Sequence, residues 1–213
     1  MTRLLLIRHG ESQANRHHLF AGSYDAPLEE NGLHQARITA KFISENYKVD
    51  KIYSSDLRRA FSTAQALADE LGQNVEKAPK IREIGAGDWE GMKFSDIIEK
   101  YPNEYKAWTE HIDMARCPNG ESIRELGQRV FAELRRIAEE NDGKTVAIAT
   151  HATPIRTSQC LITYGSLDQM QSIPWVSNAS VTVYNYENGE WSIEAVSLDS
   201  HLEGCKTALP PNV

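Results

Sequence analysis

The stretch LLLIRHGES, residues 4–12, runs four apolar residues directly into an arginine, a histidine, a glycine and an acid. A short apolar run that ends abruptly at polar residues is typical of a fully buried strand in a parallel sheet. We therefore predict a strand over residues 3–7. In open α/β sheets, ligands bind beyond the carboxyl ends of such strands. Arg8 and His9 are accordingly the first candidates for a functional site.

Apolar runs and helical periodicities alternate along most of the remaining chain. Further strands are predicted at KIYS (51–54) and TVAIAT (145–150), and a hairpin turns at Asn188-Gly189 between SVTVYNY and EWSIEAV. Apolar residues spaced for one helix face predict helices over residues 33–47, 57–71 and 123–137. The predicted fold class is α/β: a three-layer α/β/α sandwich, with a mostly parallel sheet, helices on both faces and an antiparallel edge hairpin.

The length of 213 residues suits one large domain. We predict that this domain spans residues 1–199 and that residues 200–213 form a loose C-terminal tail. The tail ends in ALPPNV, whose paired prolines do not suit a packed element.

The composition, 40% hydrophobic and 25% charged, is that of an ordinary globular protein. A formal net charge of −7 argues against nonspecific binding to nucleic acid or to an anionic membrane, and no stretch approaches the length of a membrane span. The three cysteines form no metal-binding or disulfide pattern, which favours reduced thiols and a cytoplasmic location. Any anion site must therefore be a local cationic pocket.

Polar side chains follow three of the predicted strands at the point where each strand ends. The first strand leads to Arg8 and His9, the second is followed by Arg58 and Arg59, and the third ends at His151. Because the carboxyl ends of parallel strands meet at one sheet edge, we expect a cationic cup of about phosphate size. The planar fork of arginine suits phosphate oxygens.

The loop over residues 10–32 directly follows the first strand and is rich in Gly, Ser and Asn. Asn15 could donate an amide N–H to a phosphate oxygen. Ala21 and Gly22 are small enough to bring backbone N–H groups close to one. We interpret the pair His17-His18 as loop surface, because neighbouring histidines do not face one ligand and no Cys or carboxylate spacing supports a metal.

The stretch REIGAGDWEGMKF, residues 82–94, carries an acid followed by a glycine-rich turn. Glu83 is a candidate proton donor beside the cationic cup; the alternative is an ordinary surface glutamate. The glycines at 85, 87 and 91 miss the dinucleotide-binding spacing by one residue and follow no clear strand, so that interpretation is rejected.

Taken in order, these motifs resemble those of the histidine phosphatase superfamily, also called phosphoglycerate-mutase-like, over nearly the whole chain. The span between residues 92 and 117 looks like the short lid of its broad phosphatases and α-ribazole-phosphate phosphatases. One departure is Ala152, where the family often has glycine; alanine is still small enough for its N–H to reach a phosphate. The matching segments are LIRHGES (6–12), LFAGSYDAPLEENG (19–32), YSSDLRRAFSTA (53–64), REIGAGDWEG (82–91), CPNGESIREL (117–126) and IATHATPIR (148–156).

The resemblance implies a two-step reaction through a phosphohistidine at His9, with Glu83 as general acid and base. It places Arg58 at the position of the family's functional arginine. Arg8, Arg58 and a charged His151 would bind the phosphoryl oxygens together with Asn15. No metal and no cofactor is implied, because the arginines supply the positive charge.

The favoured function is hydrolysis of small phosphorylated metabolites, with inorganic phosphate as a product. One alternative is a cofactor-dependent phosphoglycerate mutase, but mutases carry a long basic insertion that residues 92–117 lack. An alternative of another class is a non-catalytic phosphate-binding regulatory module, which the filled chemical positions disfavour. The physiological substrate and the oligomeric state are left open by the sequence.

Overall fold

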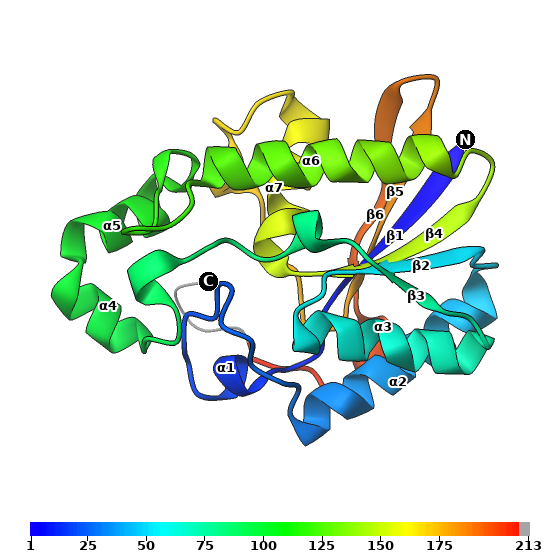
Figure 1. The fold of residues 1–213 in the computed structure, drawn as a ribbon, viewed down its shortest axis with the longest axis horizontal. Coiled ribbons are helices and arrows are strands. Elements are labelled where there is room, and N and C mark those ends of the chain that lie inside the picture. Colours follow the sequence, from blue (N-terminus) through cyan, green and yellow to red (C-terminus); the bar gives the residue numbers. More distant parts are fainter. Residues whose placement is uncertain (209–213) are drawn as a thin grey trace.

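The computed structural model describes residues 1–208, and within them six strands form one sheet in the order β3-β2-β4-β1-β5-β6 (Figure 1). The first four strands in this order are parallel, and β5 and β6 form an antiparallel hairpin at one edge. This confirms the predicted sheet. The strands are β1 (Thr2–Arg8), β2 (Lys51–Ser54), β3 (Val75–Lys77), β4 (Thr145–Thr150), β5 (Val181–Glu187) and β6 (Glu190–Leu198).

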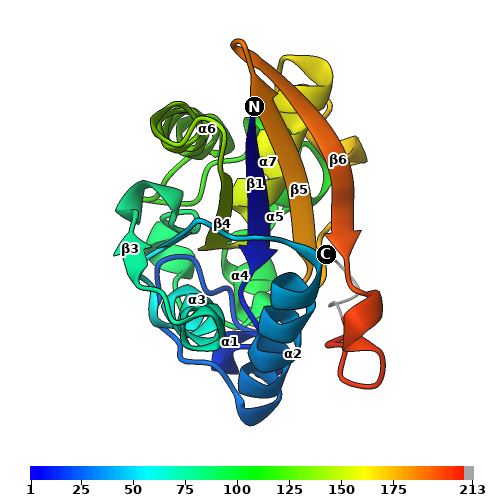
Figure 2. The ribbon, with the colours of Figure 1, turned by 90° about the vertical axis from the view of Figure 1, so that its right-hand side faces the viewer.

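Helices cover both faces of the sheet, as predicted (Figures 1 and 2). Side chains alternate between the faces of a strand, so the continuous apolar run of β1 serves two cores. Leu4 and Leu6 pack into the core under α6 (Ile123–Glu140) and α7 (Ala152–Tyr164). On the opposite face, the buried side chains of β1 pack with those of α2 (Glu30–Asn46) and α3 (Arg58–Leu71).

The smaller elements gather beyond the carboxyl ends of the parallel strands (Figure 1). The span after the acid motif folds into α4 (Phe94–Lys100) and α5 (Pro102–Glu110), and α1 (Gln13–Arg16) lies in the loop after β1. Among the helices of residues 1–208, none combines the length and the apolar character that crossing a membrane requires. The single 3-10 turns are Pro79–Ile81, Gly87–Trp89, Ile112–Met114, Met170–Ser172 and Ser200–Leu202.

Residues 200–207 are packed against the domain, which corrects the prediction that the tail is loose from residue 200. Leu202 is fully buried, and the ring of His201 stacks on Phe42 with centroids 4.3 Å apart. Gln35 of α2 donates to the Cys205 carbonyl oxygen at 2.7 Å. These contacts anchor the tail to α2; the paired prolines that suggested looseness lie outside the described residues.

Candidate active site

Strand register brings the two histidine motifs together. Arg8 of β1 pairs with Thr150 of β4, so His9 and His151 leave the sheet side by side. The His9 N–H donates to the Thr150 carbonyl oxygen at 3.0 Å, and the two imidazole rings meet edge to face with centroids 5.2 Å apart. The predicted convergence of these two strand ends is present.

The surroundings of His9 define which of its ring nitrogens carries the proton. Nδ1 lies 2.7 Å from the Gly10 carbonyl oxygen, which can only accept a hydrogen bond, so Nδ1 carries the hydrogen. Nε2 then has the lone pair, and it accepts a hydrogen bond from Nε of Arg59 at 3.2 Å. Nε2 of His9 is therefore the nitrogen available as a nucleophile.

Arg59, rather than the predicted Arg58, reaches this histidine. Arg59 is fully buried, and its two terminal nitrogens donate to the carbonyl oxygens of Gly22 (2.7 Å) and Tyr24 (2.8 Å). Arg58 is exposed, and its backbone N–H donates to the Asp25 carboxylate at 2.7 Å. Both residues lie in the first turn of α3, where successive side chains point about 100° apart. The structure therefore corrects the placement of Arg58 in the cationic cup.

Arg8 supplies the second buried guanidinium. One of its terminal nitrogens donates to the Val176 carbonyl oxygen, and its buried Nε has no hydrogen-bond partner within residues 1–208. Burial lowers the pKa of Arg8 to about 10, against the opposing attraction of Glu83. The group therefore stays charged at neutral pH, with a donor available to an anion.

Both histidines are held in the neutral form. Burial, reinforced by Arg59, lowers the pKa of His9 and of His151 well below the ordinary value of 6.5. For His9 this is the form in which Nε2 keeps its lone pair. For His151 it differs from the charged form expected there, because the ring is buried and lies beside charged arginines. His151 Nε2 instead lies 2.8 Å from the hydroxyl of Ser55, a contact that the sequence did not suggest.

The lowered pKa values of His9 and His151 predict that acid destabilises the fold. Below about pH 6.5 the unfolded chain binds more protons than the folded one. The free energy of unfolding therefore decreases as the pH is lowered. The slope is at most about 1.4 kcal/mol per pH unit for each histidine. Urea unfolding at pH 7.5 and 5.5 should show a smaller difference for His151→Gln than for the wild type. The exposed His34→Gln is the control, and an unchanged pH dependence in His151→Gln would contradict the assignment.

Glu83 lies against the first turn of α7. Its carboxylate accepts hydrogen bonds from the backbone N–H of Ile84 at 2.9 Å and of Thr153 at 3.3 Å. The N-terminus of a helix favours negative charge, so this position suits the carboxylate. The carboxylate also lines the same cavity as Arg8 and His9. The predicted acid is thus at the site rather than on an unrelated surface.

An ion pair between Arg129 and Glu121 lies next to the backbone segment that carries Glu83. Arg129 of α6 donates to both carboxylate oxygens of Glu121, at 2.7 and 2.8 Å. The same guanidinium donates at 2.9 Å to the carbonyl oxygens of Lys80, Arg82 and Glu83. All its donors are therefore engaged, and they fix the segment that leads into the acid.

Two asparagines connect the first loop with His9. The Asn15 side-chain oxygen accepts from the backbone N–H of Ser12 at 3.0 Å and from Asn178 at 3.3 Å. Asn15 lines the cavity, and with that oxygen engaged its NH₂ group is the part of the side chain left to donate. The amide of Asn178 also donates to the His9 carbonyl oxygen at 3.0 Å. Asn178 is a supporting residue that sequence reasoning missed.

The other predicted substrate-binding positions, Ala21, Gly22 and Ala152, all line the cavity. Gly22 has φ +49°, and a Cβ on it would lie 2.4 Å from the Ala86 side chain, so only glycine fits. Ala152 is the first residue of α7, which directs its N-terminus at the cavity and favours an anion there.

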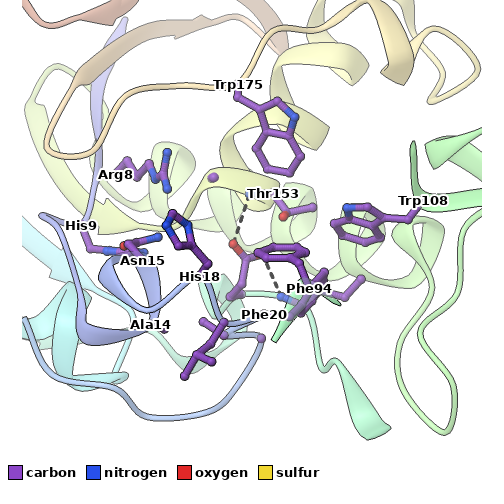
Figure 3. A pocket seen from close by; sticks show the side chains of 16 residues that line it. Arg8, His9, Ala14, Asn15, His18, Phe20, Phe94, Trp108, Thr153 and Trp175 are labelled. Carbon is purple, nitrogen blue, oxygen red and sulfur yellow. Dashed lines mark hydrogen bonds between the residues drawn. The ribbon is translucent and has the colours of Figure 1, made fainter. Parts of the chain in front are cut away.

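The cavity has a volume of about 90 Å³ (Figure 3). Arg8, His9 and Asn15 lie at one end, and Phe94 and Trp108 lie at the other, with Trp175 above them. His18 also lines the cavity although its side chain is exposed, which corrects its assignment to plain loop surface. Within residues 1–208, no three His, Cys, Asp or Glu side chains are grouped to hold a metal ion.

An α/β sheet that presents a neutral histidine between buried arginines at its carboxyl edge is an architecture for handling phosphate groups. Residues 4–199 match the model of the histidine phosphatase superfamily, branch 1, and the chain belongs to this superfamily.

Two relatives of similar sequence are phosphatases by name. The chain is 32% identical over 202 residues to Phosphoserine phosphatase 1 of Hydrogenobacter thermophilus, with 95% of each chain covered. It is 31% identical to the Metal-independent phosphoserine phosphatase of Arabidopsis thaliana, covering 95% of this chain and 84% of that one. The structure of Bacillus stearothermophilus YhfR matches with a TM-score of 0.90 and 28% identity, over 95% of this chain and all 100% of that one. The protein is a phosphatase of the histidine phosphatase type.

Proposed function

We propose that the protein hydrolyses small phosphomonoesters without a metal, through a phosphohistidine at His9. The observation that carries this proposal is the orientation of His9. Its Nδ1 hydrogen is directed to Gly10 and its Nε2 lone pair toward Arg59, in a pocket that disfavours the charged ring. A neutral imidazole with a fixed lone pair beside cationic donors is what attack on a phosphate requires.

In the first step, Nε2 of His9 attacks phosphorus while the bond to the ester oxygen breaks. Glu83, which takes up a proton from solvent as the ester binds, gives that proton to the departing alkoxide and becomes a carboxylate again. In the second step, Glu83 takes a proton from a water molecule as this water attacks the phosphorus. The P–N bond then breaks, and inorganic phosphate leaves with His9 neutral again.

Charge on the transferred phosphoryl group falls mainly on its three equatorial oxygens. Arg8 and Asn15 line the cavity together with His9, and Arg59 reaches the site through its hydrogen bond to Nε2 of His9. The hydrogen bond from Arg59 to Nε2 must break before attack, and a phosphate oxygen offers Arg59 a stronger, charge-assisted acceptor. Phosphate binding thereby frees the nucleophile. It also favours protonation of His151, since an anion raises the pKa of a neighbouring histidine.

Metal independence is part of this proposal, because the arginines supply the positive charge that a metal would otherwise give. The name of the Arabidopsis thaliana relative supports it. Phosphate release should be unchanged after dialysis against EDTA. A loss of activity that Mg²⁺ or Zn²⁺ restores would contradict this part.

The products formed from phosphate esters distinguish a hydrolase from a mutase and from a non-catalytic module. Phosphate release from sugar phosphates, phosphoglycerates, phosphoserine, nucleotides and an aryl phosphate is expected from a hydrolase. Interconversion of 3- and 2-phosphoglycerate without net release would instead identify a mutase. Phosphate binding with no turnover on any ester would identify a non-catalytic module. The short helices α4 and α5, in place of a long basic insertion, support the hydrolase.

Glu83→Gln should slow hydrolysis mainly when the leaving group is a poor one. An alkoxide needs the proton, whereas a nitrophenolate leaves without it. We expect the rate of the first step to fall about 10²- to 10⁴-fold for alkyl phosphates. For p-nitrophenyl phosphate this rate should fall much less. Single-turnover rates with both esters measure this difference. Equal losses would contradict the role of Glu83 as the acid.

Arg129→Gln should reproduce part of this leaving-group dependence, because it releases the backbone carbonyl oxygens around Glu83. A displacement of about 1 Å can reduce a rate by roughly 10²-fold, so we expect a 10- to 100-fold loss for alkyl phosphates. The loss should nearly vanish when Arg129→Gln is combined with Glu83→Gln. Arg136→Gln, which removes two ion pairs on the same helix, is the control. Additive losses in the double variant would show that Arg129 acts independently of Glu83 and would contradict its role in positioning the acid.

A further inference from the structure

We infer that the site selects phosphomonoesters whose leaving group is small, uncharged and apolar, with a single aromatic ring as the best fit. This inference rests on the proposed hydrolysis and names its substrate class. It follows from the part of the cavity that the phosphoryl group does not use.

The end of the cavity remote from Arg8 is walled by aromatic rings from separate parts of the chain (Figure 3). Phe20 comes from the loop after β1, Phe94 begins α4, and Trp108 belongs to α5. The Phe20 ring lies 5.0 Å from that of Trp108 and 5.8 Å from that of Phe94, between centroids. Such edge-to-face and tilted packing fixes the rings against one another, so this wall is present before a ligand enters.

Trp175 completes the wall, and the buried side chain of Arg156 holds it in place. The Arg156 guanidinium lies over the Trp175 ring, 4.0 Å from its centroid. Two nitrogens of Arg156 donate to the Ile173 carbonyl oxygen at 3.0 and 2.6 Å, which ties down the chain just before the ring. The next residue, Val176, accepts the hydrogen bond of Arg8. One short segment therefore positions both a phosphate-binding arginine and an apolar wall.

Charged side chains are confined to the phosphate-binding end. Among the described residues that line the cavity, those with a full charge are Arg8 and Glu83, and the mechanism uses both. Besides His9, the other imidazole in the lining is that of His18, whose side chain is exposed to solvent. The ammonium and carboxylate of a serine leaving group would lose hydration against the rings without gaining buried partners. An apolar group would gain by the same burial.

The size of the cavity limits the group to a small one. Sites for drug-sized ligands enclose roughly 300–1,000 Å³, whereas this cavity has about 90 Å³. Because that volume also includes the phosphate-binding end, it favours a compact leaving group, such as one ring or a short alkyl chain.

Three phosphate esters of primary alcohols test the inference, because their leaving groups differ little in intrinsic reactivity. We expect kcat/KM of the full chain for benzyl phosphate to exceed that for ethyl phosphate and for phosphoserine by about 10- to 200-fold, the range of discrimination by apolar pockets. Equal or higher kcat/KM for phosphoserine would overturn the inference. A selective loss of phosphoserine turnover in His18→Ala would identify the charge partner responsible.

Trp175→Ala should reduce kcat/KM for benzyl phosphate at least tenfold more than for ethyl phosphate, and Trp175→Phe should restore most of the difference. Trp191→Ala is the matched control, since Trp191 is also half-buried but packs on Phe131 and Tyr186, outside the cavity lining. Equal loss for both esters in Trp175→Ala would mean that Trp175 only supports Arg8, and it would overturn the specificity role.

Binding of phosphonates, which cannot be hydrolysed, separates this inference from the proposed function. Benzylphosphonate should bind the wild type at least tenfold more tightly than ethylphosphonate by calorimetry, and Trp175→Ala should remove that preference. If no ester is turned over but the preference is present, hydrolysis fails and the apolar selectivity stands as a binding property. If esters are turned over and both phosphonates bind equally, the selectivity fails and hydrolysis stands.

Discussion

Replacing His9 with alanine is expected to reduce turnover of any phosphomonoester by about 10⁵- to 10⁶-fold, the scale seen when a covalent nucleophile is removed. Nε2 of His9 is the acceptor toward which Arg59 is directed, and the neighbouring His151 cannot replace it. His151 is fully buried and is not among the described residues that line the cavity, so its ring is not presented to a substrate there. Initial rates of phosphate release from p-nitrophenyl phosphate measure the loss.

The control for this variant is His34→Ala, an exposed histidine on α2 that should retain full activity. Circular dichroism and the thermal midpoint should show that His9→Ala is folded, because the main structural bonds of that residue are made by its backbone. Retention of more than about one per cent of wild-type kcat would contradict a covalent role for His9.

The second large effect separates two neighbouring arginines. Arg59→Ala should reduce kcat/KM by about 10²- to 10³-fold, since loss of one preorganised donor to a developing anion raises the barrier by about 2.7–4 kcal/mol. Arg58→Ala should stay within about twofold of the wild type, because its side chain is exposed. Both variants are assayed with the same aryl phosphate.

Loss of Arg59 also leaves buried carbonyl oxygens of Gly22 and Tyr24 without their donors, so stability must be measured beside activity. Arg59→Lys provides the check: it keeps the charge but cannot donate to His9 and both carbonyl groups at once. A partial recovery of activity is expected. If Arg58→Ala were the impaired variant and Arg59→Ala were active, the structural assignment would be wrong.

Much of the fold was predictable because its signals are local. The run at residues 3–7 is apolar without alternation, since both faces of β1 are covered, and Asn188-Gly189 marks the hairpin turn directly. The strand β3 was not predicted: it has three residues and two of them are exposed, so it has no apolar pattern. The packing of residues 200–207 on α2 depends on contacts with Gln35 and Phe42 that no local pattern reveals.

The site was predictable where strand register alone positions a residue, as for His9 and His151. The choice between Arg58 and Arg59 depended on helix phase, and the sequence did contain that signal. Arg58 lies about 200° around the helix from the buried Ala60, which places it on the solvent face. Asn178 was not recognisable, because its partners, His9 and Asn15, are more than 160 residues away. Only the folded chain brings them together.

The most direct test of the account is isolation of the phosphoenzyme. Wild-type protein mixed with p-nitrophenyl phosphate and quenched in base within milliseconds should carry one phosphoryl group by intact mass. The label should be stable in base, lost in acid, and located by peptide mapping on the segment that contains His9. A phosphoryl group on any other residue, or phosphate release with no labelled enzyme at any quench time, would contradict the phosphohistidine mechanism.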